Sequence, residues 1–328
     1  MKDKILTLLR QEAGFVSGQE LCDHFGVSRT AVWKAINGLK SEGYEIESSP
    51  RKGYRLCKVP DVLTEQELKS VMDTAWAGQT IEAHERICYS TNLRAKQLAD
   101  MGTAHGTLVV ADVQAGGKGR RGREWVTTPA GTNIAMSLVL RPDIPPVKAS
   151  MLTLVAALAV RDGVEKMTGI KPQIKWPNDL VINKKKICGI LTEMTMEAEY
   201  IQYIILGIGL NVNNESFVGE LEDKATSLYL ETGKKYGRAE LVAASMKAFE
   251  HYYEQFVEDL SLKQMVEEYN QSLAGLNQKV CVLEPGKNWE GISRGINEDG
   301  ELLVEDGEGK VEAVYAGEVS VRGLYGYV

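Results

Sequence analysis

The chain has few of the residues that cross-link a protein or hold a transition metal. Its five cysteines stand far apart without a C-x-x-C pair, and its four histidines are equally scattered. An odd number of widely spaced cysteines is typical neither of a disulfide framework nor of a zinc ribbon. We therefore expect no transition-metal site, and the sequence leaves the ligands of any other metal ion unknown.

Long apolar runs are also absent. The longest, residues 151–160, stops at Arg161, whereas a membrane-spanning helix needs roughly 18 to 20 apolar residues. The N-terminus is charged within its first four residues, which does not fit a secretory signal. With 328 residues, 44% of them apolar, the chain is expected to form two or three compact domains in the cytoplasm, with no membrane contact.

Positive charge is concentrated near the N-terminus. Residues 1–60 carry ten Lys and Arg against seven Asp and Glu, whereas the whole chain has a net charge of −7. Such an asymmetry indicates that this segment is the part of the chain that meets a polyanion.

The same segment has the signals of a winged helix-turn-helix. Ser17 opens an S-x-x-E capping box, which predicts a short helix that ends before Gly26. Ser28 can cap a second helix after a three-residue turn, with Gly43 just past its end. The stretches YEIES and YRL then predict two strands joined by a cationic turn at residues 49–53.

Several side chains of this module are candidates for DNA contact, because they are polar, aromatic or cationic and fall on one helix face or at the hairpin tip. The alternative is a small helical interaction domain with a solvated face. One copy would neutralise few phosphates, so useful specificity should require a dimer on a two-fold-related site. The candidates are Arg29, Thr30, Trp33, Lys34 and Asn37 on the second helix, and Arg51 and Lys52 at the tip.

A domain boundary is predicted near Pro60, because Thr64 begins a newly capped helix. From about residue 80 to 270, buried-type strands alternate with longer helical patterns, which indicates an α/β or α+β domain of catalytic size.

The loop QAGGKGRRGR at residues 114–123 is the most unusual stretch of this domain. It combines four glycines with four cationic side chains. Glycines allow close backbone approach, and guanidinium groups match phosphate or carboxylate oxygens. The spacing fits neither a Walker A loop nor a dinucleotide-binding G-x-G-x-x-G. A phosphate cradle, a nucleic-acid contact and a solvated loop all remain open.

Three other stretches are weaker candidates. Residues 90–92, Ser-Thr-Asn, cap a predicted helix and could either cap it alone or bind a polar ligand head. Lys175 ends the alternating run PQIKW before Pro177, where it could face a ligand or solvent. Asn211 lies in GIGLNVN, where a ligand could press against the glycines.

Together, these motifs resemble a known family. YSTN, GGKGRRGREW, KWPNDL, KKICGILTE, GIGLNVN and GISRGI occur in order, and they resemble the bifunctional biotin protein ligases that also repress the biotin operon. The resemblance implies an α+β multidomain protein. Its parts are an N-terminal winged helix-turn-helix (1–60), a central α/β catalytic domain like that of class II aminoacyl-tRNA synthetases (61–275), and a C-terminal SH3-like β-barrel (276–328). Five short strands predicted at about 279–322 agree with the barrel.

The resemblance also implies a two-step reaction. Biotin and ATP, with Mg²⁺, form biotinyl-5'-AMP, and biotin then passes to a lysine of a biotin carboxyl carrier protein. The other expected partners are operator DNA and a second copy of the chain, in a homodimer that biotinyl-5'-AMP favours.

Matching the motifs of the family to this sequence implies the site residues, with Lys175 and Arg120 as catalytic groups. Ser90, Thr91, Asn92, Gln114, Lys118, Gly119, Arg120 and Lys175 are expected to bind biotin. Arg120, Arg121, Arg123, Trp125, Asn178 and Asn211 are expected to bind ATP and the adenylate. The alternatives are a lipoate-type ligase and a non-enzymatic, ligand-sensing repressor.

Overall fold

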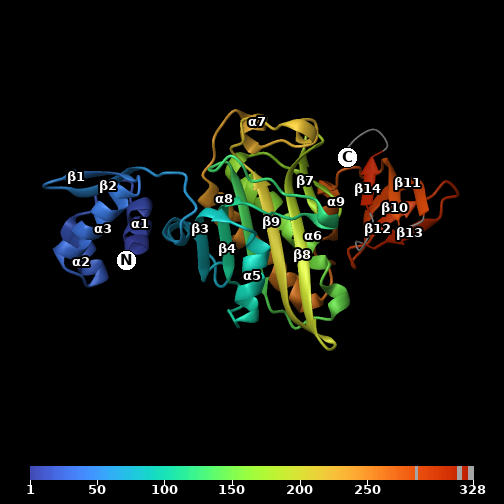
Figure 1. The fold of residues 1–328 in the computed structure, drawn as a ribbon, viewed down its shortest axis with the longest axis horizontal. Helices are drawn as coiled ribbons and strands as arrows, with labels where there is room; N and C mark the ends of the chain where they lie inside the picture. Colours follow the sequence, from blue (N-terminus) through green and yellow to red (C-terminus); the bar gives the residue numbers. More distant parts are fainter. Residues whose placement is uncertain (285–286, 316–319, 324–328) are drawn as a thin grey trace.

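The structure, a computed structural model, describes residues 1–284, 287–315 and 320–323, which form three units in a row (Figure 1). The N-terminal unit confirms the predicted helix-turn-helix and hairpin, and adds a helix at residues 2–11 that was not predicted. Its elements are α1 (Lys2–Gln11), α2 (Gly18–Phe25), α3 (Arg29–Ser41), β1 (Glu45–Ser49) and β2 (Gly53–Lys58).

The caps expected from the sequence set the ends of these helices. The Ser17 hydroxyl accepts the Glu20 N–H at 3.0 Å, and the Ser28 hydroxyl accepts the Ala31 N–H at 3.3 Å. Gly26 ends α2 at φ 63°, a left-handed conformation that glycine adopts without strain. The unit has its own apolar core, which includes Ile5, Leu6, Leu9, Leu21, Val32, Ile36, Leu39 and Ile46.

The central unit is built on a mixed seven-stranded sheet in the order β3-β4-β5-β9-β8-β7-β6. The strands are β3 (Ile81–Cys88), β4 (Leu108–Gln114), β5 (Asn133–Leu140), β6 (Gln173–Lys175), β7 (Asp179–Ile182), β8 (Lys185–Glu197) and β9 (Tyr200–Asn211). The helices are α4 (Glu65–Val71), α5 (Thr91–Asp100), α6 (Met151–Thr168), α7 (Leu228–Thr232), α8 (Arg238–Asp259) and α9 (Val266–Ser272).

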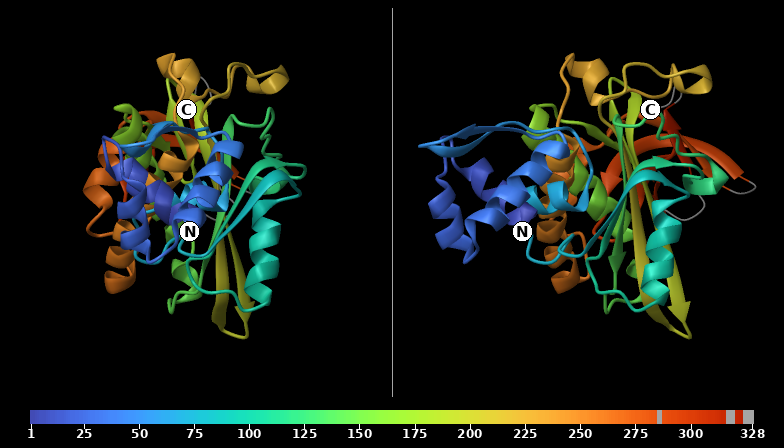
Figure 2. Two further views of the ribbon diagram at one scale, coloured as in Figure 1. Left: turned by 90° about the vertical axis from the view of Figure 1, so that its left-hand side faces the viewer. Right: turned by 60° about the vertical axis from the view of Figure 1, so that its left-hand side comes forward.

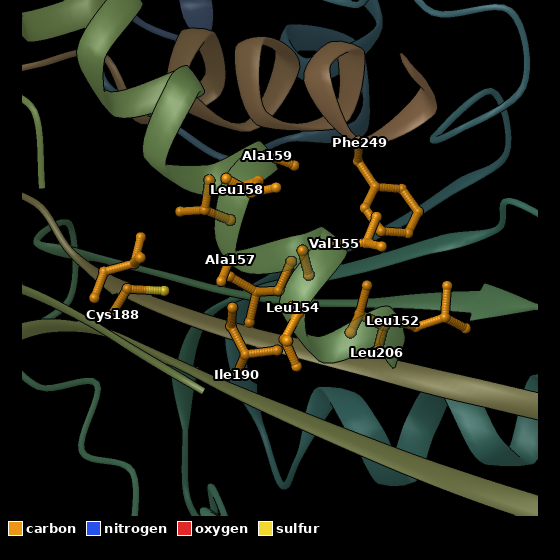
Figure 3. Packing of buried hydrophobic residues seen from close by; sticks show 14 of the residues in the cluster. Leu152, Leu154, Val155, Ala157, Leu158, Ala159, Cys188, Ile190, Leu206 and Phe249 are labelled. Atoms are coloured by element: carbon orange, nitrogen blue, oxygen red, sulfur yellow. The ribbon is translucent and has the colours of Figure 1, made fainter. Parts of the chain in front are cut away.

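Alternating side chains assign the two faces of this sheet to different helices, which lie on opposite sides of it in Figure 2. On one face, Val109, Val139 and Ile205 pack with Ala95 and Ala99 of α5. On the other face, the neighbouring positions of the same strands pack under α6 and α8. Figure 3 shows this core, with Leu154, Ala157 and Leu158 of α6 near Ile190 and Leu206. On its face of the sheet, α5 contacts β4, β5 and β9, and a cleft lies beside it over β8 and the last part of β9.

The winged helix contacts the central unit through a buried ionic cluster. Arg10 of α1 pairs with Glu67 of α4 and, at 3.0 Å, with Glu240 of α8. The Tyr44 hydroxyl donates to the same Glu67. Burial raises the pKa of the Glu67 carboxyl above its usual range, because desolvation disfavours its charged form.

A second junction forms around Arg238, which begins α8 and is 1% exposed. Its guanidinium donates to Asp61 of the linker at 3.1 Å and pairs with Asp112 of β4. It also donates to the Asn133 carbonyl at 3.0 Å, and Asp61 accepts a further bond from Asn213 at 3.0 Å. The linker is thereby tied to the strand that leads to Gln114.

The C-terminal unit is a five-stranded antiparallel sheet in the order β13-β12-β11-β10-β14, which confirms the five predicted strands and fits an SH3-like barrel. Unlike the winged helix, it shares its apolar core with the central unit through Val280, Ile296 and Val304. The strands are β10 (Lys279–Glu284), β11 (Lys287–Ile296), β12 (Leu302–Glu305), β13 (Val311–Val314) and β14 (Ser320–Gly323).

Among the helices of the described residues, none combines the length and the apolar character that crossing a bilayer requires. The expected domain limits at residues 60 and 275 remain predictions.

Candidate active site and DNA interface

One cleft has as its floor a strip of bare backbone on β8 and β9, on the face of the sheet that α5 partly covers. Gly189 pairs with Gly209, and Leu191 pairs with Gly207. A Cβ atom on Gly207 would collide with the Asn92 amide, and one on Gly209 would collide with the Trp125 indole. Only glycine therefore allows these side chains to lie directly on the strands.

One wall of the cleft is formed by polar groups at the start of α5. Ser90 caps this helix, and the Gln114 side-chain carbonyl accepts the Thr91 N–H at 2.7 Å. Ser137 of β5, which is fully buried, lies within hydrogen-bond distance of the Thr91 hydroxyl (2.8 Å) and of the Asn92 carbonyl (2.6 Å). These bonds fix the hydroxyl and amide groups before any ligand arrives.

The cationic loop covers the opposite side of the cleft. Its backbone closes on itself, because the Gly119 N–H donates to the Arg123 carbonyl at 2.7 Å and the Trp125 N–H donates to the Gly117 carbonyl at 2.9 Å. Arg120 points inward and donates to the side-chain amide oxygen of Asn178 at 3.1 Å. Burial lowers the pKa of the Arg120 guanidinium from its ordinary value, with Asp179 opposing this shift and Arg121 adding to it. A bound anion would stabilise this partly desolvated cation.

Trp125 and Lys186 meet at the centre of the cleft. The indole lies against the backbone of Gly209, and its buried Nε1–H has no hydrogen-bond partner among the described residues. The Lys186 Nζ lies 5.5 Å from the centre of an indole ring and pairs with Asp179 at 2.5 Å. An ammonium group and an unpaired N–H donor therefore face the same space.

The cleft encloses about 460 Å³, part of it open to solvent. It contains most of the predicted site residues and adds Lys186 and Gly189, which sequence reasoning missed, beside Gly207 and Gly209 of the GIGLNVN stretch. The predicted residues that line it are Ser90, Thr91, Asn92, Gln114, Lys118, Gly119, Arg120, Trp125 and Asn178.

Four predicted residues lie outside this lining. Lys175 ends β6, and Asn211 is buried at the end of β9, where it donates to the Thr226 carbonyl at 3.1 Å. Arg121 and Arg123 are exposed on the outside of the loop. For Lys186, the sequence offered no clear signal, because in a regular alternating strand a residue three positions before Gly189 is expected on the opposite face.

The described residues contain no cluster of three or more His, Cys, Asp or Glu side chains that could hold a metal ion.

The DNA candidates of the winged helix are all exposed or partly exposed. On α3, Arg29, Thr30, Trp33 and Lys34 are exposed, with Trp33 at 58%, and Asn37 is partly exposed. Arg29 is held by Gln19 of α2 at 2.8 Å. At the hairpin tip, Arg51 and Lys52 are exposed, and the Lys52 ammonium lies 5.7 Å from the centre of the Phe15 ring.

Family models match each of the three units. Residues 2–55 match an HTH domain, residues 85–211 match the biotin/lipoate A/B protein ligase family, and residues 275–322 match the biotin protein ligase C-terminal domain. The structure of the chain also resembles that of a biotin protein ligase from Aquifex aeolicus, in complex with biotin and ATP, with a TM-score of 0.65 and 29% identity. That match covers 75% of this chain and 99% of the Aquifex chain.

Relatives match along almost the whole sequence. The bifunctional ligase/repressor BirA of Bacillus subtilis is 42% identical over 324 residues, which span 97% of this chain and 98% of the relative. The Escherichia coli protein of the same description is 28% identical over 326 residues, 98% of this chain and 99% of the relative. The chain therefore belongs to the biotin protein ligase family.

Proposed function

We propose that this protein is an ATP-dependent biotin protein ligase that also represses transcription of biotin genes. The observation that carries the proposal is the cleft, in which a glycine floor and a polar wall face three cations, Lys118, Arg120 and Lys186. Such a site suits a ligand with a neutral polar head and a phosphate-bearing end.

The first reaction joins the biotin carboxylate to the α-phosphate of ATP and releases pyrophosphate. Both reactants are anionic, so the chain must offset their repulsion and stabilise charge on phosphorus. We assign this role to Arg120 and Lys186, because both side chains line the cleft, and we transfer to Lys186 the catalytic role predicted for Lys175. Ser90, Thr91 and Gln114 would hold the biotin head.

The residues outside the cleft lining have less direct roles in this proposal. Arg121 and Arg123 would contact the adenylate only if the loop closes further over it. Asn211 would lie near the adenine, beyond Trp125, at the end of the same strand as Gly209.

The second reaction transfers biotin to the carrier protein. The unprotonated ε-amine of an acceptor lysine attacks the acyl carbon of biotinyl-5'-AMP, an amide bond forms, and AMP leaves with the bonding electrons of the broken C–O bond. The cations that bind the phosphate also stabilise this leaving group.

Mg²⁺ fits this site as a companion of ATP. Mg²⁺ usually binds substrate phosphates, water and one or two carboxylates, and the cleft lining contains no carboxylate. Bound in this way, the ion would supply charge neutralisation at the phosphates. Asp179, which pairs with Lys186, is a carboxylate beside that region.

The test of the proposed function is exchange of radiolabelled pyrophosphate into ATP. Exchange that requires biotin would demonstrate adenylate formation, whereas a ligand-sensing repressor without enzyme activity would show none. Lipoate and octanoate serve as controls, because a lipoate-type ligase would support exchange with these acids and not with biotin.

Arg120→Gly should release the adenylate faster. Removing one charge-assisted hydrogen bond should cost roughly 1.5 to 3 kcal/mol, about ten- to a hundredfold in the dissociation rate. Chase experiments with preformed biotinyl-5'-AMP measure that rate. Arg51→Gly, at an exposed position of the hairpin tip in the winged helix, is the matched control, and equal rates for Arg120→Gly and the parent chain would contradict the assignment.

Repression would depend on the winged helix and on a homodimer favoured by biotinyl-5'-AMP, acting in the cytoplasm. If the adenylate orders the loop at residues 114–125 and the loop lies at the dimer surface, the ligand would shift the equilibrium toward the dimer and so toward operator DNA. Sedimentation with and without adenylate tests this proposal, and an unchanged monomer fraction would count against it.

Trp33→Ala should weaken specific DNA binding about five- to thirtyfold. The exposed indole can bury apolar surface against base edges, at about 1 to 2 kcal/mol for partial burial. Anisotropy with DNA selected by this protein from a random pool measures the loss. Lys34→Ala is the control, because a lost phosphate contact should weaken binding to all DNA sequences alike. It should also reduce the slope of log affinity against log salt concentration by about one. Equal losses on selected and random DNA for Trp33→Ala would reject base contact.

A further inference from the structure

Glu193 of β8 is a carboxylate just outside the cleft lining, and it takes no part in the reaction steps described above. Gly189, Leu191 and Glu193 alternate along the strand and therefore face the same side of the sheet. The first two line the cleft. Glu193 is the next residue outward, and its side chain is exposed. It therefore stands at the entrance on the side of α5.

The carboxylate of Glu193 is held in place by a cleft residue. The Asn92 amide donates from Nδ2 to Glu193 Oε2 at 2.6 Å. Asn92 is fixed in turn by Ser137, at 2.6 Å from its carbonyl oxygen, and by close packing on Gly207. Glu193 therefore has a defined position relative to the floor of the site.

Because Asn92 is neutral, its hydrogen bond does not neutralise the negative charge of the Glu193 carboxylate. Within the described residues, Glu193 forms no ion pair, whereas Asp179, outside the cleft lining, is paired with Lys186. Lys118, Arg120 and Lys186 make the interior cationic. A molecule that enters past Glu193 thus meets one fixed negative charge before it meets three positive ones.

An acceptor lysine is the substrate that needs such an arrangement. With an ordinary pKa of about 10.4, its amine arrives as an ammonium ion, and the cations that hold the adenylate repel it. We propose that Glu193 binds this ammonium group and positions it at the entrance before it loses its proton and attacks. This inference rests on the proposed ligase function and assigns one residue of acceptor recognition.

The substitution Glu193→Gln separates charge from structure. The glutamine carbonyl can still accept the Asn92 hydrogen bond, so Asn92 stays in place while the negative charge is lost. We expect the KM for a carrier domain with a single acceptor lysine to rise about three- to tenfold, as for loss of a well-positioned surface ion pair. Biotin-dependent pyrophosphate exchange should be unchanged, because that reaction involves no lysine.

Two further measurements complete the test. Hydroxylamine is largely uncharged at neutral pH, so its discharge of enzyme-bound adenylate should be the same in Glu193→Gln and in the parent chain. Glu197→Gln, an equal loss of charge further along β8 at another exposed position, is the matched control and should leave the carrier KM unchanged.

The outcomes are distinct. An unchanged carrier KM in Glu193→Gln overturns the proposal, as does an equal rise in Glu197→Gln. A parallel loss of reaction with hydroxylamine also overturns it, because Glu193 would then act on the site as a whole. Lack of biotin-dependent exchange in the parent chain would instead reject the ligase function on which the proposal rests.

Discussion

Replacing Lys186 by methionine is expected to slow adenylate formation about 100- to 1000-fold. The expectation follows from the position of its ammonium group, inside the cleft, beside Trp125 and opposite the cationic loop. Removing one preorganised group that stabilises developing charge typically costs this much in other enzymes. Pyrophosphate exchange under saturating biotin and ATP measures the change.

Lys175→Met is the matched control for this experiment. Lys175 lies in β6 and Lys186 in β8, which are separated in the sheet only by β7, but Lys175 is not part of the cleft lining. A small effect at position 175 together with a large one at 186 would support the assignment from the structure, and the reverse would restore the prediction from the KWPND motif. Because Lys186 also pairs with Asp179, a thermal melt must show that Lys186→Met is folded.

Arg238→Met should destabilise the chain by about 3 kcal/mol. The substitution keeps much of the buried volume but leaves Asp61, Asp112 and the Asn133 carbonyl without their shared donor. Breaking a buried ion pair from one side costs about 3 to 5 kcal/mol, and we take the lower end because the Asp61 side chain is 33% exposed.

Urea denaturation tests this prediction through the midpoint of the transition that reports on the central unit. The midpoint should fall while the slope stays constant, which identifies a change in stability. Lys247→Met, at a half-exposed position of the same helix, is the control. A loss below about 1 kcal/mol for Arg238→Met would show that the junction contributes little, because surface substitutions usually stay within about 0.5 kcal/mol.

The local signals in the sequence were reliable where structure depends on near neighbours. The caps at Ser17, Ser28 and Thr64 all accept the expected backbone N–H three residues on. Strong alternation also predicted β6, where Ile174 is fully buried and Gln173 is exposed. Helix α1 was missed, because its start has no side-chain cap.

The site was harder to predict because its residues meet only in three dimensions. Gln114 and the N-terminus of α5 were expected to bind ligand, but the bonds from Gln114 and Ser137 that fix Thr91 depend on strand pairing far along the chain. Lys186 is one of three consecutive lysines, and nothing local shows which of them faces the cleft. Asp179 and Trp125 identify it only once β7, β8 and the loop are brought together.

The winged helix has an apolar core of its own, whereas the barrel shares one with the central unit. Detaching the barrel would open that common interior to water, but detaching the first sixty residues would expose mainly the Arg10 contacts and the linker. The DNA-binding unit could therefore be gained or lost as one piece without unfolding the catalytic part of the chain. A chain without this unit would have only the ligase activity and would not bind a promoter.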